Sequence, residues 1–343
     1  MPPPSRTLCL VPRISGVAGP ASFQRRLSAG LEARGFSVGF DLEQDSCDAV
    51  LVIGATRRLG ALRRTRARGV PVFQRLDGMN WIHRRRRTGV RHYLRAEVNN
   101  LMLRWVRTRL AQAVVYQSEF VRRWWESAHG VAPGAGRVIR NGVPLDFFTP
   151  DGPSESARTG TRLLVLEGAI GGGYEIGLTW AAELAAGLAR ERVRRPVQLV
   201  IVGPKRNRKA DAAPRPDVDV VWLGEVSPDQ VPFQLRSADL LYSADVHPAC
   251  PNSVIEALAC GLPVVAFDTG AVSEIVDGRC GAVVPYGGDS WKLDPPDFAS
   301  LTAAARGLLA GGRSFREGAR RRAESEFGLG RMLDEYLELF GWM

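Results

Sequence analysis

The chain has 343 residues, enough for two domains of ordinary size. With 45% hydrophobic and 24% charged residues it is neither disordered nor collagen-like nor a coiled coil, and no apolar run reaches the ~20 residues of a membrane helix. The N-terminal segment lacks the apolar stretch of a secretory signal, so we expect a cytoplasmic protein. Residues 1–150 hold 25 basic and 10 acidic residues, a net charge of +15, whereas residues 151–343 hold 21 and 26, a net charge of −5. This asymmetry predicts that the first half meets an anionic partner.

The first half alternates short β-rich runs with longer stretches of helical period. The runs have the length of buried strands, and the intervening stretches place apolar residues on one face of a helix. Such alternation is typical of a parallel sheet covered on both faces. We expect strands at residues 7–11, 36–40, 49–53, 71–75, 113–117 and 137–139, and helices at residues 22–33, 58–68, 91–110 and 119–128.

A segment rich in Pro, Gly, Ser and Thr at residues 149–160 is the predicted linker, and the alternation begins again after it. We therefore predict an α/β chain of two doubly wound, Rossmann-like domains facing across a cleft: residues 1–150, and residues 161–343 with terminal helices. Ligands bind outside the carboxyl ends of such strands, so the cleft is the expected site. The second set of strands is expected at residues 162–166, 198–202, 218–223, 240–243, 264–267 and 282–284, with helices near 175–190, 228–236, 253–260, 272–276, 297–311 and 314–340.

Cysteines and histidines give no sign of a metal site. The five cysteines are odd in number and irregularly spaced, which fits neither a disulfide framework nor a zinc knuckle, so we expect buried thiols. The histidines are few and scattered. The cysteines are Cys9, Cys47, Cys250, Cys260 and Cys280, and the histidines are His83, His92, His129 and His247.

The segment at residues 251–266, PNSVIEALACGLPVVA, is the most informative of the chain. Asn252 and Ser253 can cap the helix that follows, and Glu256 is then expected on its first turn, where the helix dipole favours a carboxylate. Such a carboxylate suits a bidentate hydrogen bond to a ribose diol, although a capping glutamate with no ligand explains the spacing equally well.

This segment, with Gly270 and SEIVDG at residues 273–278, resembles the donor site of the retaining GT-B glycosyltransferases of family 4, also called glycosyl transferases group 1. Residues 138–150, VIRNGVPLDFFTP, and residues 115–120, VYQSEF, resemble two further motifs of that family. The resemblance spans both predicted domains. It implies transfer of a sugar from a nucleotide-diphosphate sugar to a hydroxyl acceptor, with no metal or other cofactor.

The resemblance also implies roles for individual residues. Glu256 would bind the ribose, the backbone around Gly224 and Glu225 would face the base, and amides near Thr269 and Gly270 would surround the diphosphate. The glycine-rich loop at residues 168–173, GAIGGG, follows a predicted strand and allows close approach of a phosphate or sugar, with a flexible loop as the alternative. The donor-binding candidates are Gly16, Gly171, Gly172, Lys205, Arg206, Gly224, Glu225, Asn252, Ser253, Val254, Glu256, Thr269 and Gly270.

In the first domain, Asp77 ends a predicted strand where family members carry a polar residue that contacts the sugar. Asp77 and Glu256 are the candidate catalytic residues, and a turn-forming Asp-Gly is the alternative for Asp77. Gly16 follows the first strand and would admit the acceptor or the diphosphate.

Two departures from the family favour a second hypothesis. The family pairs two glutamates eight positions apart, and the earlier position here is Pro248. The glycine loop also lacks the family's basic residues, which Lys205 and Arg206 could replace. The alternative is therefore a catalytically weakened GT-B chain that serves as a partner subunit or scaffold.

The arginine run at residues 83–87, HRRRR, continues into a predicted helix with Arg91, Arg95 and Arg104 beside Tyr93 and Trp105. Clustered arginine near aromatic residues suits phospholipid headgroups, a lipid-linked diphosphate or an acidic glycan, and a solvated helix face is the alternative. No nucleic-acid-binding motif accompanies it. We therefore expect an anionic or lipid-linked glycan acceptor, synthesis of a polysaccharide, envelope glycan or glycolipid, and peripheral contact with the cytoplasmic membrane face.

Overall fold

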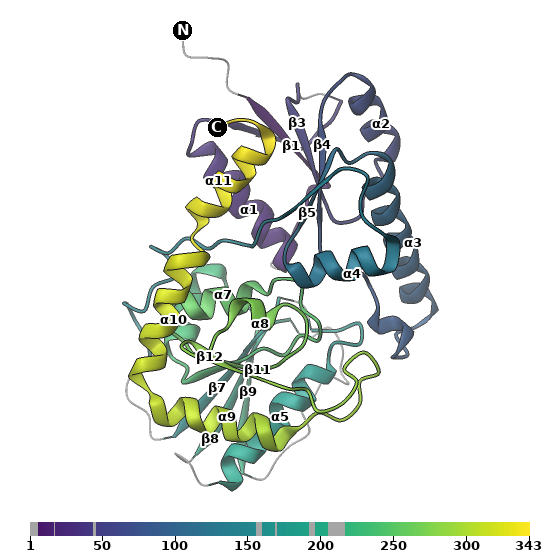
Figure 1. Cartoon of the computed structure of the whole chain (residues 1–343). Coiled ribbons are helices and arrows are strands. Elements are labelled where there is room, and N and C mark those ends of the chain that lie inside the picture. Colours follow the sequence, from purple (N-terminus) through teal and green to yellow (C-terminus); the bar gives the residue numbers. More distant parts are fainter. Residues whose placement is uncertain are drawn as a thin grey trace. The chain divides into compact units, whose positions relative to one another are not determined.

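The computed structural model describes residues 6–16, 18–43, 46–155, 160–168, 170–191, 196–204 and 217–343, and the chain forms two compact units. Residues 1–84, 88–142 and 329–343 make the first unit, and residues 85–87 and 143–328 make the second. Each unit is built on a six-stranded sheet whose paired strands are all parallel. The predicted α/β class and the two doubly wound domains are confirmed (Figure 1).

The sheet of the first unit has the strand order β2-β1-β3-β4-β5-β6. Its strands lie within two residues of the predicted bounds. They are β1 (Thr7–Val11), β2 (Ser37–Gly39), β3 (Ala49–Ile53), β4 (Val72–Leu76), β5 (Ala113–Tyr116) and β6 (Ala135–Val138). The helices are α1 (Gly19–Glu32), α2 (Leu59–Ala67), α3 (Val90–Arg109), α4 (Glu119–His129) and α11 (Leu329–Phe340), with a 3-10 turn η1 (Ile82–Arg84).

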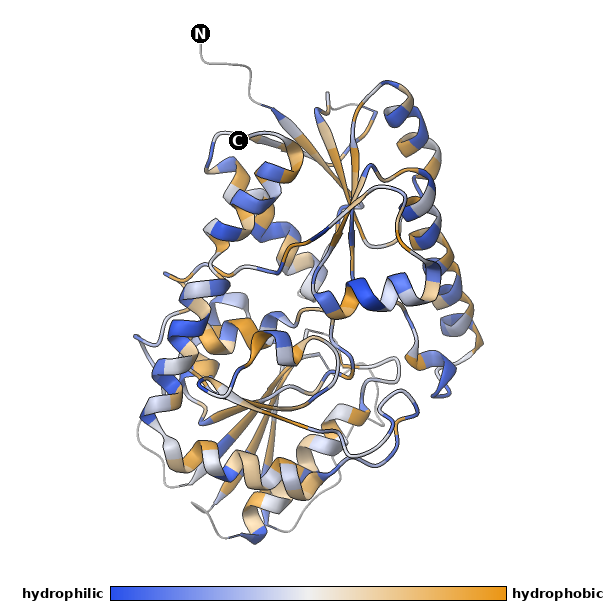
Figure 2. Cartoon of the chain, viewed as in Figure 1, coloured by the Kyte–Doolittle hydropathy of each residue, from blue (hydrophilic) through white to orange (hydrophobic). Residues whose placement is uncertain are grey.

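Alternation along β1 and β3 divides the core of this unit into two layers. Leu8 and Leu10 face one cluster, which includes Phe23 of α1, whereas Val50 and Val52 face the other, which includes Val106 of α3. Successive side chains of a strand point to opposite faces, so both faces of a central strand must be apolar. Helices therefore cover both faces of the sheet, as Figure 2 shows by the orange strands between mixed blue and orange helices.

The last helix belongs to the first unit and corrects the predicted domain bounds. Helix α11 buries Leu333, Tyr336 and Phe340 in the same cluster as Leu8 and Phe23. A Cβ on Gly30 of α1 would lie 2.5 Å from a methyl carbon of Leu333, so glycine there allows the two helices to approach. Burial of this apolar face draws the end of the chain back to the first sheet.

The predicted linker is also corrected, because its described part is bonded within the second unit. The Arg236 side chain donates to the carbonyl oxygen of Pro153 at 2.9 Å, and the Glu155 amide donates to the Ser237 hydroxyl at 2.8 Å. The unit boundary falls earlier, between Gly142 and Val143. Residues 156–159 lie outside the described residues.

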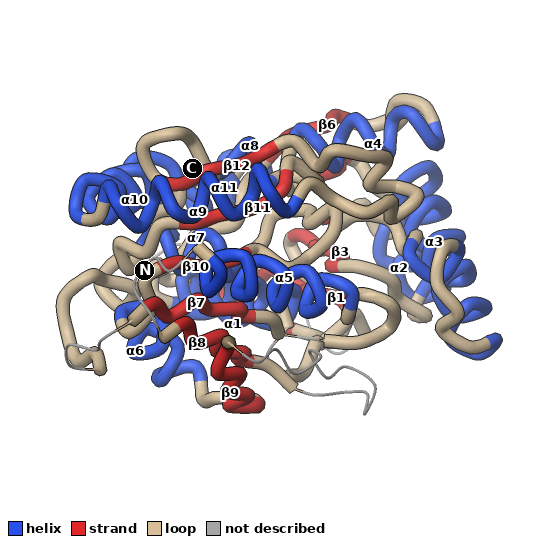
Figure 3. Tube along the Cα trace, turned by 90° about the horizontal axis from the view of Figure 1, so that it is seen from below, coloured by secondary structure: helices blue, strands red, loops and turns tan. Residues whose placement is uncertain are grey.

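The second sheet has the order β12-β11-β10-β7-β8-β9, and Figure 3 shows β7, β8 and β9 side by side. Its strands are β7 (Thr161–Leu166), β8 (Val197–Val202), β9 (Val218–Gly224), β10 (Leu240–Tyr242), β11 (Val264–Phe267) and β12 (Gly281–Val284). The helices are α5 (Ile176–Arg190), α6 (Val231–Arg236), α7 (Asn252–Ala259), α8 (Val272–Ile275), α9 (Phe298–Gly311) and α10 (Arg313–Glu326), with a 3-10 turn η2 (Pro228–Gln230).

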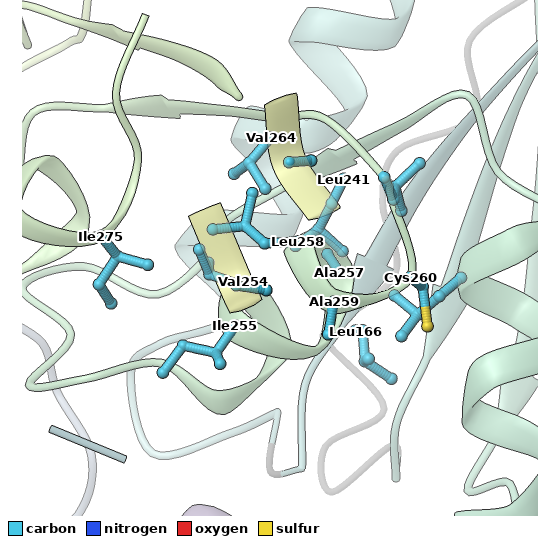
Figure 4. Packing of buried hydrophobic residues seen from close by; sticks show 14 of the residues in the cluster. Leu166, Leu241, Val254, Ile255, Ala257, Leu258, Ala259, Cys260, Val264 and Ile275 are labelled. Carbon is cyan, nitrogen blue, oxygen red and sulfur yellow. The ribbon is translucent and has the colours of Figure 1, made fainter. Parts of the chain in front are cut away.

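Helix α7 is held by an apolar face that packs in the core of the second unit. Val254, Ile255 and Leu258 are fully buried and pack with Leu241 of β10 and Val264 of β11 (Figure 4). A helix with such an apolar face is fixed by burial of that face against the rest of the core. The position of α7, and of the residues that flank it, is therefore fixed by the core of the second unit.

The expectation for the cysteines is wrong for two of the five. Cys9 on β1 and Cys47, just before β3, form a disulfide with Cα atoms 5.8 Å apart. Strands β1 and β3 are neighbours in the sheet, which brings together two cysteines 38 positions apart in sequence. The other three, Cys250, Cys260 and Cys280, are buried thiols as predicted.

Candidate functional site

Loops that follow β7, β10 and β11 meet at the carboxyl edge of the second sheet. A Cβ on Gly177, the second residue of α5, would lie 1.9 Å from the carbonyl oxygen of Ala244, so the start of the helix that follows the β7 loop rests on the loop after β10. The Ala271 amide donates to the Pro248 carbonyl oxygen at 2.9 Å, which joins the loop after β10 to the turn after β11. This is the edge at which open α/β sheets bind ligands.

Gly270 is the tightest point of this edge. Its φ is +64°, and a Cβ there would lie 2.5 Å from both Cδ and N of Pro248. Because L-residues with a side chain avoid this φ, and backbone atoms fill the space, glycine is required. The position at which the resembling family carries a glutamate therefore holds a proline that is packed on the predicted phosphate turn.

Two carboxyl groups, Glu167 and Asp245, lie at the ends of β7 and β10. The backbone amides of Ala244 and Asp245 donate to the Glu167 carboxylate. Burial, reinforced by the nearby Asp245, raises the pKa of Glu167 well above its usual range, and burial raises the pKa of Asp245 to about 7. The pair therefore retains protons at pH values at which exposed carboxyls are ionised. Neither residue was among the site residues predicted from the sequence, and no local sequence motif indicates that the two carboxyl groups form a pair.

His247 is a further residue of this edge that was not predicted as a site residue. It adopts a φ of +58°, and its ring stacks on Trp291 with centroids 3.7 Å apart and planes at 12°. Burial lowers the pKa of His247 to about 4, so the imidazole is neutral at pH 7. The stack ties the loop after β10 to the segment around Trp291.

The glycine loop after β7 has the backbone freedom that its sequence predicts. Gly172 and Gly173 adopt φ values of +68° and +107°. The Gly173 amide donates to the Glu175 carboxylate at 2.7 Å, and the Tyr174 amide donates to the carbonyl oxygen of Gly171 at 3.4 Å. The loop is therefore closed on itself by its own acidic residue.

The predicted cap of α7 is wrong in detail. Asn252 is the first residue of the helix, and Pro251, whose side chain has no hydrogen-bonding group, occupies the N-cap position. Glu256 is therefore the fifth residue of α7 and lies beyond the first turn. Glu256 is 8% exposed. Proline fits this position because an N-cap residue has an extended backbone, and the φ of −68° at Pro251 lies in the range that proline imposes.

In the first unit, Asp77 directly follows β4 and is the centre of a polar network. Its carboxylate accepts hydrogen bonds from Arg75 at 2.9 Å and from the amide of Gln117, and its carbonyl oxygen accepts from the Trp125 indole at 2.8 Å. Arg75 also donates to Asn141 at 2.8 Å. The Arg75 side chain is buried, whereas that of Asp77 is one-third exposed at 33%. The network thus presents one anchored carboxylate to solvent at the carboxyl end of β4.

The sequence predicted Asp77 as a site residue but did not predict the residues that hold its carboxylate. Gln117 and Asn141 occur in motifs that carried the family resemblance, whereas Arg75 does not, and the three come from three separate strand ends. Strands β4 and β5 are adjacent in the sheet, which brings Arg75 and Gln117 to one edge. The adjacency of those strands, rather than any local spacing, is the signal that would have connected them.

The remaining predicted residues are distributed as follows. Gly16 follows β1 with a φ of +97°, and its carbonyl oxygen accepts from Arg25 at 2.7 Å. Gly224 ends β9 with a φ of +73°, its carbonyl oxygen accepts from the Gly203 amide at 2.8 Å, and Glu225 is exposed beside it. Lys205 and Arg206 lie outside the described residues. Thus Gly16 and Asp77 belong to the first unit, and the other described candidates belong to the second.

Comparison with solved structures identifies the fold. Sucrose-phosphate synthase from Thermosynechococcus elongatus superposes with a TM-score of 0.72, at 14% identity over 98% of each chain. A glycosyltransferase from Rickettsia africae gives 0.71, at 16% identity over 98% of each chain. HepE from Anabaena, solved with UDP and glucose, gives 0.69, at 15% identity over 99% of this chain and all of the other. The fold is GT-B.

A segment of the second unit also matches a family model. Residues 162–309 match the family model described as glycosyl transferases group 1. This confirms the resemblance over the matched segment, which is 148 of the 343 residues of the chain.

Curated relatives match in part. The MMP alpha-(1->4)-mannosyltransferase of Mycolicibacterium hassiacum is 28% identical over 209 residues, which are 57% of this chain and 46% of the relative. The D-inositol 3-phosphate glycosyltransferase of Gordonia bronchialis is 34% identical over 180 residues, 46% of this chain and 38% of the relative. The chain therefore spans less than half the length of these relatives.

Proposed function

We propose that this protein is a retaining glycosyltransferase that moves a sugar from a nucleotide-diphosphate donor to a hydroxyl acceptor. The observation that carries the proposal is the match of residues 162–309 to the group 1 glycosyltransferase model, in a segment where the loops after β10 and β11 meet at Gly270. The Anabaena HepE structure was determined with UDP and glucose, so a uridine-diphosphate sugar is the first donor to test.

In the second unit, the donor would lie along the carboxyl edge of the sheet. Glu256 would hold the ribose, and the backbone at Gly224 and Glu225 would face the base. Amides of Asn252, Ser253 and Val254 at the start of α7, with those of Thr269 and Gly270, would surround the diphosphate, since a helix N-terminus and a glycine turn both present N–H groups to an anion. Gly171 and Gly172 would approach the sugar, and Lys205 and Arg206 would add positive charge. The proposal includes no metal cofactor.

In the first unit, Asp77 would accept a hydrogen bond from a hydroxyl of the donor sugar or of the acceptor. Its two hydrogen-bond donors, Arg75 and Gln117, hold the carboxylate in one orientation. A side chain that is already oriented contributes to catalysis because it need not reorganise when the transition state forms. Gly16 would admit the acceptor, an anionic or lipid-linked glycan. A leaving phosphate that itself takes the acceptor proton would make a dedicated general base unnecessary.

The test is calorimetric titration with UDP-glucose and GDP-mannose, together with hydrolysis of each donor, for wild type and for Glu256→Gln. The substitution keeps the size of the side chain but weakens a charge-assisted bidentate bond, so the Kd should rise about 10- to 100-fold. Glu191→Gln is the matched control, because it removes a surface carboxylate of the same unit that pairs with Arg306 at 2.8 Å.

Absence of nucleotide-sugar binding by the wild type would refute the proposal. Tight donor binding without turnover on any acceptor would instead support the alternative, a weakened GT-B partner subunit. The packing of Pro248 on Gly270, where the resembling family has a glutamate, is the observation that favours this alternative.

A further inference from the structure

Helix α3 carries apolar residues on the face that it turns away from its own sheet. Val90, Leu94, Val98 and Leu101 recur at intervals of four, four and three residues, so they form one stripe along the helix. They are 77%, 59%, 52% and 64% exposed, and Tyr93 beside them is 43% exposed.

The opposite face of α3 is the one that packs on the first unit. Ala96, Leu103 and Val106 are buried there, and the carbonyl oxygen of Leu103 accepts from the Gln74 side chain of β4 at 3.0 Å. A surface helix of a globular protein needs one apolar face, so the core accounts for this side and leaves the exposed stripe unexplained. Figure 2 shows both hydropathy colours along the length of α3.

Exposed apolar side chains of the described residues are concentrated on α3. Among the described residues, nine large hydrophobic side chains are exposed, and five of them lie on α3. Single exposed apolar residues are ordinary, but a contiguous group marks an interaction surface.

Positive charge surrounds the stripe. Arg91 and Arg95 flank it on one side, Arg104 lies on the other, and all three are exposed. Between residues 84 and 109 the sequence has nine arginines and one acid, Glu97. Glu97 is bonded by Arg84 at 2.6 Å and by His83 at 2.9 Å, so its negative charge is balanced locally.

We propose that the exposed stripe of α3 is a docking face for an anionic phospholipid bilayer, with the helix lying in the plane of the interface. The apolar side chains would enter the boundary between headgroups and acyl chains, the arginines would reach the phosphates, and Tyr93 would lie at the boundary. A protein partner of this chemistry would need acidic residues around an apolar groove, whereas an anionic bilayer presents both features over any area. The proposal goes beyond sugar transfer and does not depend on it.

The test is flotation of the purified full chain with vesicles of phosphatidylcholine alone, or of phosphatidylcholine and phosphatidylglycerol in equal parts. Wild type should float with the mixed vesicles and stay behind with the neutral ones. The double variant Leu94→Ser, Leu101→Ser should partition at least about thirtyfold more weakly, because two largely exposed leucines lose their burial in the bilayer. The double variant Arg91→Gln, Arg95→Gln should lose about tenfold or more.

Matched controls separate this face from the rest of the unit. Val131→Ser removes a side chain that is 77% exposed but lies outside α3, and Arg63→Gln removes an exposed arginine of α2. Both should bind vesicles as the wild type does. Equal loss in these controls, equal binding to neutral vesicles, or wild-type flotation of the leucine variant would each overturn the proposal.

A second copy of the chain could cover the stripe instead of a bilayer, and light scattering tests this because it measures the oligomeric state. A wild-type dimer that the leucine variant converts to a monomer, with no vesicle binding by either, would replace the membrane with a self-interface. Donor titration of the leucine variant should match the wild type. If neither the wild type nor the variants bind the donor, but the wild type still binds vesicles, the result counts against the proposed sugar transfer and not against the docking face.

Discussion

Substitution of Gly270 by alanine should be much more costly than the same change at Gly224. Both glycines have left-handed backbones, with φ values of +64° and +73°. The conformational cost of a Cβ there is about 1–2 kcal/mol at either position. At Gly270 the Cβ would also lie 2.5 Å from two atoms of Pro248, whereas at Gly224 no atom of the described residues lies within 4 Å. Overpacking against backbone adds about 1–3 kcal/mol, so Gly270→Ala should lose roughly 2–5 kcal/mol in total.

The assay is urea unfolding followed by tryptophan fluorescence and far-UV circular dichroism. Fluorescence suits this site because Trp291 stacks on His247, the neighbour of Pro248. The difference between the two variants should be about 1–3 kcal/mol in the free energy of unfolding. If Gly270→Ala and Gly224→Ala agree to within about half a kcal/mol, the packing of Pro248 on the turn does not constrain the site as we describe.

Three further predictions concern other parts of the chain. The free energy of unfolding should fall as the pH rises from about 4 to about 7, because folding raises the pKa of Asp245 from 3.8 to about 7. In this range the unfolded chain has already released the proton that the folded chain retains. Urea titrations of Asp245→Asn should show a smaller dependence of this free energy on pH. Cys47→Ser should cost about 3–4 kcal/mol, since the disulfide closes a loop of 38 positions, and a reductant should destabilise wild type but leave the variant unchanged. Tyr336→Ala should cost about 3–5 kcal/mol because this ring is fully buried against Phe23 and Phe340; a melting temperature equal to that of the wild type would contradict the placement of α11.

The regular elements of both units could be predicted because local pattern determines them. Strands β3 and β11 coincide with the predicted ranges at residues 49–53 and 264–267, since a short apolar run bounded by turn residues allows few other structures. Helix α1 shows the limit, because it begins at Gly19, three residues before the prediction. Pro20 favours the first turn of a helix, and this shifts the start toward it.

Features that depend on which strands are neighbours could not be predicted. The Cys9–Cys47 disulfide requires β1 beside β3, and the contact of Gln117 with Asp77 requires β4 beside β5. Likewise the α3 segment was predicted as a helix with a basic run, but its exposed stripe is seen only once the opposite face is buried. In each case the missing information is the arrangement of elements that are distant in sequence.

The return of α11 to the first unit has a consequence for the order in which the protein can fold during synthesis. The first unit needs Leu333, Tyr336 and Phe340 to close one layer of its core, and the ribosome makes them after the whole of residues 143–328. The second unit is translated later than the first sheet, but its last segment ends at residue 328. All of its segments are therefore synthesised before the first unit is complete. We therefore expect one apolar face of the nascent first sheet to stay exposed until the final helix emerges from the ribosomal exit tunnel. During that time it can be cleaved by proteases or bound by chaperones.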